Sequence, residues 1–283
     1  MSNAAKGAWW MIGAAAALTT MAVFIKFLPV YSILLMIFLR NVINLILMAP
    51  SILRQGKSVY QTEKLSLHAL RNALLYGGNV AWFYGVTLIA LADVAALQFT
   101  SPLFTAIVAT AFLGEKISGH RIIAIAVGFA GALIIIRPGM IPIETGTLVI
   151  LLAALLYSGA NVVTKRLSDT ESGNTVVFYM SVTILIYSAI PAFFVWQTPK
   201  LADLPAFVGL GITGYATHYC ITRSLAKGDA SFVIAFDFMR LPFSAIVGWF
   251  LFREILDLWT CVGALIIFAA GYYSTVREVQ NPG

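Results

Sequence analysis

The chain is an almost unbroken series of apolar segments, each long enough to cross a lipid bilayer. A helix of about 17–25 apolar residues spans the hydrocarbon core of a bilayer, and runs of this length follow one another with little polar sequence between them. Charged residues make up only 11% of the 283 residues, against about 25% in soluble domains. These features predict an integral membrane protein, with no soluble domain among these residues.

Apolar runs bounded by charged residues, glycine or proline predict ten membrane-spanning helices. We therefore expect an all-α membrane protein. The expected helices cover residues 8–26, 30–50, 72–91, 93–113, 121–137, 146–164, 175–196, 204–222, 231–251 and 259–276.

Basic residues are distributed unevenly among the segments that connect these helices. If the N-terminus is cytoplasmic, the opposite loops hold only Lys26, Arg137, Lys200 and Arg253. Cytoplasmic loops of membrane proteins carry such an excess of positive charge. We therefore expect a multi-pass protein of the inner or plasma membrane with both termini in the cytoplasm. Loop orientation also accounts for 18 Lys and Arg against 12 Asp and Glu residues, and no basic soluble patch indicates nucleic-acid binding.

The two halves of the chain contain similar segments in the same order. In the first pair, "AAALTTMAVFIKFL" resembles "AALLYSGANVVTKRL". In the second, "SPLFTAIVATAFLGE" resembles "LPFSAIVGWFLFRE", which aligns Pro102 with Pro242 and, after a gap, Glu115 with Glu254. Apolar stretches can look alike by chance, but the shared order favours an internal repeat.

Each half contains five expected helices, which is an odd number. The second half must therefore enter the membrane from the side opposite to the first. The sequence predicts two inverted repeats, residues 1–138 and 139–283. Repeats of this kind are common in secondary transporters, whose substrate sites lie near the membrane midplane where the repeats meet.

Three segments together resemble EamA-type transporters of the drug/metabolite transporter superfamily: "SPLFTAIVATAFLGEK", "GFAGALIIIRPG" and "FMRLPFSAIVGWFLFRE". The resemblance covers essentially the whole chain. It implies a ten-helix secondary transporter that works by alternating access, with a central cavity lined mainly by the first, third, fourth, sixth, eighth and ninth helices. Many members export amino acids or other small metabolites. The second repeat departs from the pattern at Arg253, where the first has Gly114, so the tight turn before the acid is in doubt there.

Asp237 and Arg240 are charged residues inside the ninth expected helix, 231–251. Arg240 lies near its centre, and the spacing of three places Asp237 on the same helix face. A charge at this depth costs at least ~2.5–3.5 kcal/mol on insertion scales. Two interpretations are open. The residues form an ion pair that only fixes helix packing, or they line a cavity in which Arg240 binds an anionic group and Asp237 balances it or carries a proton.

Arg40 lies near the centre of the second expected helix and is the other deep arginine. Asp237 is the one deep acid, so one positive charge is unmatched. A substrate carboxylate or phosphate would supply the missing partner, because a guanidinium suits both groups. The alternative is that Arg40 bonds backbone carbonyls, reaches a lipid phosphate, or holds its helix against a neighbour.

Pro102 and Pro242 stand inside the fourth and ninth expected helices, where each removes a backbone donor and frees a carbonyl. Helix breaks at equivalent places in two repeats point to a binding site. Proline kinks without any ligand role are also common. We therefore name both prolines as candidate helix breaks beside the cavity.

Polar and aromatic residues at helical spacing suggest the walls of a pocket for a semi-polar organic solute. The alternative is that such polar residues only hold membrane helices together. Besides Arg240 and Asp237, the substrate-binding candidates are Tyr76, Asn79 and Trp82 of the third helix, Gln98 of the fourth, and Tyr157 and Asn161 of the sixth.

His218, in the eighth expected helix, is a second proton-coupling candidate beside Asp237, because imidazole changes charge in the physiological pH range. The sequence has no GxxxxGK[S/T] loop for ATP, so a gradient, exchange or downhill flow must supply the energy. Cys220 and Cys261 fall inside apolar runs and imply neither a disulfide framework nor a zinc site. We expect no cofactor and no metal.

The sequence favours a secondary active transporter of a small organic metabolite, with an amino acid or another carboxylate-bearing solute as best guess and export as the expected direction. A neutral or cationic solute fits instead if Asp237 faces the ligand. The alternative from another class, a polytopic membrane enzyme acting on lipid-linked substrates, needs acids, histidines or metal ligands clustered at one membrane face, whereas here they are scattered. Expected partners are the small-molecule substrate, the lipid bilayer and a proton as candidate coupling ion, for a monomer or a homodimer.

Overall fold

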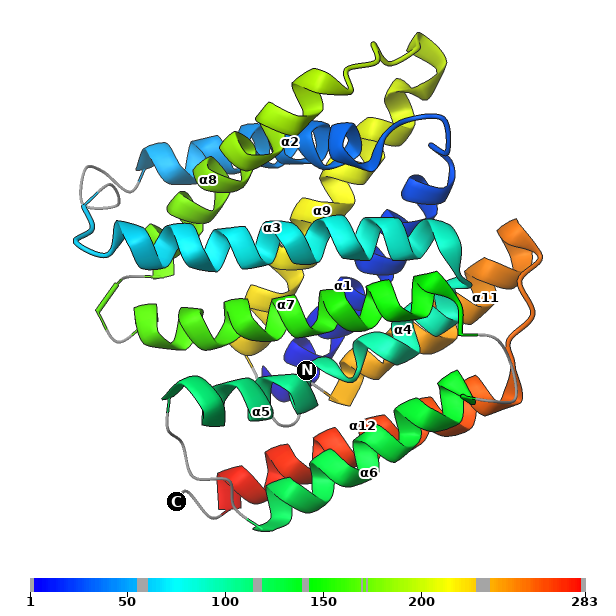
Figure 1. Cartoon of the computed structure of the whole chain (residues 1–283). Helices are drawn as coiled ribbons and strands as arrows, with labels where there is room; N and C mark the ends of the chain where they lie inside the picture. Colours follow the sequence, from blue (N-terminus) through cyan, green and yellow to red (C-terminus); the bar gives the residue numbers. More distant parts are fainter. Residues whose placement is uncertain are drawn as a thin grey trace.

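The computed structural model describes residues 3–54, 61–113, 119–138, 143–168, 170–171, 173–227 and 235–280, and the elements of this part are helices (Figure 1). This confirms the all-α fold expected from the sequence. The helices are α1 (Asn3–Lys26), α2 (Ile33–Arg54), α3 (Leu65–Leu88), α4 (Leu91–Gln98), α5 (Ser101–Leu113), α6 (Gly119–Ile136), α7 (Thr145–Ser168), α8 (Gly173–Phe194), η2 (Leu201–Asp203), α9 (Leu204–Leu225), η3 (Ala235–Met239), α11 (Arg240–Phe252) and α12 (Leu258–Gln280).

These helices make ten crossings when α4 with α5, and η3 with α11, are each counted as one. If each of the ten spans the membrane, α1 begins and α12 ends on the same side, because ten is an even number. We call the opposite side the far face; it consists of the connections that follow α1, α3, α6, α8 and α11. In Figure 1 α12 ends at the left, and α3 and α11 end toward the right, at the far face.

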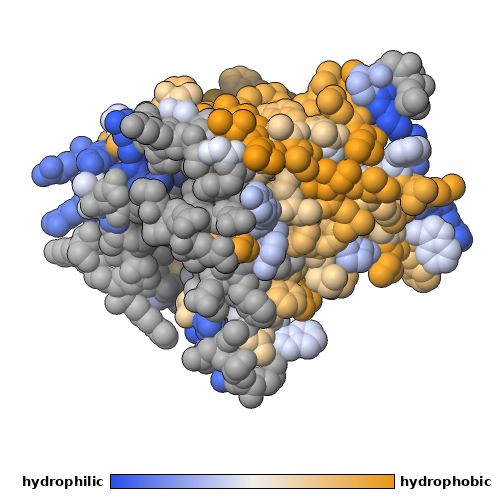
Figure 2. Space-filling view, turned by 90° about the horizontal axis from the view of Figure 1, so that it is seen from below, coloured by the Kyte–Doolittle hydropathy of each residue, from blue (hydrophilic) through white to orange (hydrophobic). Residues whose placement is uncertain are grey.

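The surface of the helix bundle is apolar, as contact with lipid requires. Phe112, Phe193 and Phe250 are 75%, 77% and 72% exposed, and Figure 2 shows a broad apolar area on the face seen from below. Large apolar patches of this kind mark contact with membrane or protein rather than water. Five segments of the described part are long and apolar enough to cross a membrane: Ala5–Lys26, Ile33–Pro50, Leu91–Phe112, Thr145–Leu167 and Thr175–Phe194.

The helix contacts follow the symmetry of two inverted repeats. α1 packs against α9, and α7, its equivalent in the second repeat, packs against α3. In the same way α5 packs on α7 as α11 does on α1, and α2 packs on α9 as α8 does on α3. Equivalent helices also pair with each other, as α6 and α12 do at the bottom of Figure 1. The two repeats are therefore interleaved rather than lying side by side as separate lobes.

The fourth and ninth expected helices are not continuous, which corrects the sequence prediction for 93–113 and 231–251. α4 ends at Gln98 and α5 begins at Ser101; likewise η3 is followed by α11 at Arg240. Residues 231–234 lie outside the described part. Pro102 and Pro242 stand in the first turn of α5 and of α11 instead of inside a long helix. A helix accepts proline in its first turn, because the backbone N–H there has no intrahelical acceptor.

The turn after α11 forms although the second repeat has arginine where the first has glycine. Arg253 itself adopts the left-handed conformation, with φ of 58° and ψ of 27°. Its N–H donates to the carbonyl of Trp249, and the N–H of Glu254 donates to the carbonyl of Gly248. The turn thus caps the helix and sets the position of Glu254. The equivalent residues of the first repeat, 114 and 115, lie outside the described part.

Candidate functional site

A small cavity lies between α1, α3, α4 and α11. These elements belong to the first, third, fourth and ninth crossings, four of the six that the resemblance implied for a central cavity. The wall is mostly apolar and carries few polar groups. The lining residues are Leu18, Thr19 and Ala22 of α1, Trp82 of α3, Leu91, Val94, Ala95 and Gln98 of α4, and Arg240 and Ser244 of α11.

Arg240 contributes the positive charge of this cavity. Its Nη2 donates to both carboxylate oxygens of Asp237, at 2.6 and 2.7 Å. Its Cζ lies 5.9 Å from the centre of the Phe99 ring, and its Nε is buried without a hydrogen-bond partner. Asp237 therefore holds the guanidinium through one nitrogen, and donor capacity remains for an anionic ligand group.

The break before α11 explains how this pair is positioned. Arg240 is the first residue of α11, and Asp237 lies in the preceding turn, η3. A carboxylate next to a helix N-terminus is favoured by the helix dipole. The pair thus stands at a helix junction, and not in the middle of an uninterrupted helix as the sequence suggested.

Trp82 and Gln98 give the cavity an aromatic wall and an amide. Trp82 is 6% exposed and packs edge-on against Phe83, with ring centres 5.8 Å apart. Gln98 is the last residue of α4, and its Oε1 is buried without a partner. The hydroxyls of Thr19 and Ser244 are 3.4 Å apart and join α1 to α11. The site therefore offers a hydrogen-bonding amide beside a cation and an indole ring.

The other residues named from the sequence lie outside this cavity wall. The Tyr157 hydroxyl donates to Asn79 Oδ1 at 3.1 Å, and Tyr157 is within electrostatic range of Arg40 and Arg240. The hydroxyl of Tyr76 is buried without a partner. Asn161, also on α7, is exposed. The structure thus brings Tyr157 and Asn79 together and leaves Asn161 exposed.

Arg40 is buried in α2 without an acidic partner. It is 7% exposed, and its Cζ lies 5.0 Å from the centre of the Phe83 ring. Nη2 reaches Asn41 Oδ1 only at 3.4 Å, and Nε has no partner. The ion pairs found in the described residues do not include Arg40. In the described part of the chain, the contacts found for its guanidinium are an aromatic face and a weak hydrogen bond.

His218 lies on α9, and its side chain is exposed. Asp237 instead pairs with Arg240 at the start of α11. The two proton-coupling candidates therefore do not form one hydrogen-bonded group in the described part of the chain.

Two further lining residues, Ser244 and Thr19, carry signals in the sequence. Ser244 follows Arg240 by four positions, which places it on the same face of α11. Thr19 is a polar residue in a run of alanines in the first helix. No sequence signal indicates that Leu91, at the start of α4, lines the cavity, because it is one of many leucines in apolar runs.

Comparison with known proteins identifies similar transporters over most of the chain. A model of the EamA-like transporter family matches residues 5–137 and 144–276. An S-adenosylmethionine uptake transporter of Rickettsia bellii is 29% identical over 85% of this chain and 83% of its own. A riboflavin transporter of Brucella anthropi is 32% identical over 83% and 85% of the two chains. A pseudopaline exporter of Pseudomonas aeruginosa is 26% identical over 83% of each.

The architecture also matches a protein of known crystal structure. The two chains align with a TM-score of 0.63 over 99% of each, at 16% sequence identity. This similarity shows that the fold is shared, and it carries no information on the substrate.

Proposed function

The chain belongs to the EamA-like transporter family of the drug/metabolite transporter superfamily, a family of small-molecule transporters and not of enzymes, and on this premise we propose that it carries a small organic metabolite with a carboxylate group by alternating access. Arg240 binds the carboxylate, Asp237 holds Arg240 in place, and Trp82 and Gln98 contact the rest of the solute.

The observation that carries this proposal is the bonding of Arg240 at the cavity. Asp237 bonds to Nη2 alone, while Nε remains without a partner. A guanidinium presents several N–H donors in a planar fork that matches a carboxylate. A ligand carboxylate can therefore bind Arg240 without displacing Asp237.

The charge inside the membrane also favours an anionic group. Arg240 and Asp237 neutralise each other, whereas Arg40 has no acidic partner in the described residues. Burying an uncompensated charge is costly, so the interior as a whole favours a ligand that brings negative charge.

The substrates named for the relatives fit this site in part. S-adenosylmethionine carries a carboxylate and an adenine ring, whereas riboflavin has a flat aromatic ring system and no carboxylate. A planar ring packs favourably on an indole such as that of Trp82. The names include both uptake transporters and an exporter, so we propose that transport be assayed in both directions.

Ligand-dependent stability of the purified protein tests the proposal. Amino acids, S-adenosylmethionine, other organic acids, riboflavin and amines are screened by thermal unfolding, because a ligand at 100 times its Kd stabilises by about 2.7 kcal/mol. We expect carboxylates to raise the unfolding temperature of the wild type and of Arg223→Ala. Arg223 is a matched control because it is exposed and bonds only to Tyr219 in the described part. Arg240→Ala is expected to lose the response.

A neutral replacement of the pair separates ligand recognition from folding, because Arg240→Ala leaves Asp237 unpaired. The double variant Asp237→Asn with Arg240→Gln keeps hydrogen-bonding groups at both positions and removes both charges. We expect it to fold and to ignore carboxylates. Carboxylate stabilisation of this variant equal to wild type, or stabilisation of the wild type by amines alone, would show that Arg240 is not the recognition residue.

A further inference from the structure

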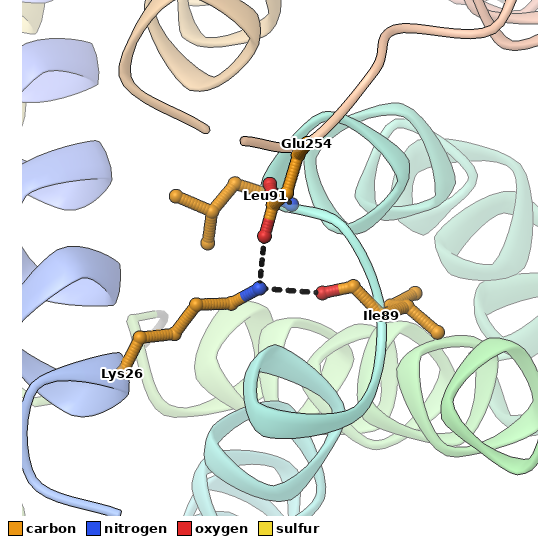
Figure 3. Close-up of polar contacts among 4 residues, drawn as sticks. All are labelled: Lys26, Ile89, Leu91 and Glu254. Carbon is orange, nitrogen blue, oxygen red and sulfur yellow. Dashed lines mark hydrogen bonds and ion pairs between the residues drawn. The ribbon is translucent and has the colours of Figure 1, made fainter. Parts of the chain in front are cut away.

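A polar junction joins three segments at the far face, all of them near the cavity. Lys26 at the end of α1 forms an ion pair with Glu254 and donates to the backbone carbonyl of Ile89 at 3.0 Å. The second oxygen of Glu254 accepts the N–H of Leu91 at 2.8 Å. Figure 3 shows Lys26 and Glu254 meeting beside the connection between α3 and α4.

This ion pair is shielded from solvent on several sides. The side chains of Lys26 and Glu254 are only 14% and 15% exposed. The Lys26 Nζ also lies 5.3 Å from the centre of the Phe252 ring, and Ile89 is 5% exposed. Charges in such a shielded place interact more strongly than a surface pair does, so the junction is a real obstacle to separating the segments.

The backbone around Glu254 is shaped to place its carboxylate here. Arg253 turns the chain back through its left-handed conformation, and Glu254 then folds over the last turn of α11. A Cβ atom at Gly248 would lie 2.4 Å from Glu254 Oε2. Glycine at this position therefore leaves the space that the carboxylate occupies.

The junction is continuous with the wall of the cavity. Leu91, which donates to Glu254, also lines the cavity and is 1% exposed. The two helices that carry Lys26 and precede Glu254, α1 and α11, contribute Thr19 and Ser244 to the same wall. The junction thus ties together α1, α4 and the end of α11, three of the four elements that enclose the cavity.

We propose that the Lys26–Glu254 ion pair, with its bonds to Ile89 and Leu91, is the far-face gate of the transport path. It closes the path in this structure and breaks when the far face opens. The inference rests on the alternating access proposed above, but not on the chemical class of the solute.

The distance between the two sides of the gate tests this role without any substrate. Leu201, beside the start of α9, and Ile255, beyond Glu254, are 85% and 87% exposed at the far face. Spin labels on cysteines at these two positions report the separation in lipid nanodiscs, after Cys220 and Cys261 are replaced by serine. We expect one dominant short distance in the parent protein and an added longer-distance population in Lys26→Met and in Glu254→Gln.

Three comparisons make the expectation specific. The double variant should open no further than the more open single variant, because both changes remove the same contact. Lys26→Arg keeps the charge and the donors, and it should stay closed. The control Arg137→Met removes another far-face ion pair, with Asp257, whose residues do not line the cavity, and it should also stay closed.

The outcomes distinguish a gate from a general loosening of the protein, and they test the gate independently of the proposed substrate. A distance distribution in Lys26→Met that is the same as in the parent overturns the gate, and so does equal opening in Arg137→Met. Loss of the carboxylate response in the thermal screen with a normal gate would contradict only the recognition role of Arg240.

Discussion

Arg253 holds a backbone conformation that residues other than glycine rarely adopt. Its φ is 58°, and the left-handed region costs a side chain with a Cβ roughly 1–2 kcal/mol. The side chain is exposed and makes no hydrogen bond or ion pair that would repay this cost in the described structure. Arg253 therefore stores strain in the turn that positions Glu254.

Arg253→Gly should stabilise the protein. The strain energy that is relieved is larger than the roughly 0.5–1 kcal/mol that glycine costs in conformational entropy on folding. We therefore expect the free energy of unfolding to rise by about 0.5–1 kcal/mol, seen as a higher thermal unfolding midpoint. Arg137→Gly is the matched control: Arg137 also has a positive φ, 47°, but its side chain pairs with Asp257. No net gain is expected there. A lower midpoint for Arg253→Gly would show that the arginine side chain supports the turn.

Single residues of the site could be named from the sequence only where charge or polarity was unusual for their depth. Arg240, Trp82 and Gln98 stood out in this way and line the cavity. Asn161 follows Tyr157 by one helical turn. Tyr157 packs against α3, where a Cβ at Gly78 would lie 2.7 Å from its ring, whereas Asn161 is exposed. Which of two such residues faces inward depends on the neighbouring helix, and spacing within one helix does not contain that information.

At the scale of elements, α6 and α12 come into close backbone contact at two glycines, Gly131 and Gly263. A Cβ on Gly131 would lie 2.8 Å from the carbonyl oxygen of Gly263, and a Cβ on Gly263 would lie 2.5 Å from that of Gly131. Small residues allow membrane helices to pack at such short range. The two equivalent helices of the repeats thus depend on glycine at their contact.

Gly131→Val should weaken this contact, because the added side chain forces the backbones apart. Overpacking of this kind costs about 1–3 kcal/mol, which thermal unfolding in detergent would detect as a lower midpoint. Gly119→Ala is the control on the same helix, since a Cβ there meets nothing within 4 Å. Equal effects of the two substitutions would contradict the proposed close contact.

The sequence predicts whole elements better than it predicts their interruptions and partners. Long apolar runs located the ten crossings, because crossing a bilayer requires hydrophobic length. Hydropathy did not show the breaks before α5 and α11, since it does not depend on whether the helical hydrogen bonds continue. Pro102 and Pro242 did mark both places as candidate helix breaks. The Lys26–Glu254 pair was also missed, because it joins two connections that are 228 residues apart.

For the whole molecule, the interleaved contacts predict that neither repeat is stable alone. α1 packs on α9 and α11, and α3 packs on α7, so each half buries its surface mainly against the other. Fragments 1–138 and 139–283 expressed separately should aggregate or be degraded, whereas coexpressed fragments should copurify. Size-exclusion chromatography with a tag on one fragment checks this. A stable, monodisperse first fragment on its own would contradict it.

The separation of Lys26 and Glu254 along the chain also determines when, during synthesis, their ion pair can form. Ribosomes add roughly 5–20 residues per second, so Glu254 is made on the order of 10–50 s after Lys26 at their separation of 228 residues. During this interval the ammonium of Lys26 has no Glu254 to pair with. Its long aliphatic stem allows it to reach the lipid headgroups instead. The proposed gate can therefore form only after Glu254 has been made, well after α1 has left the ribosome.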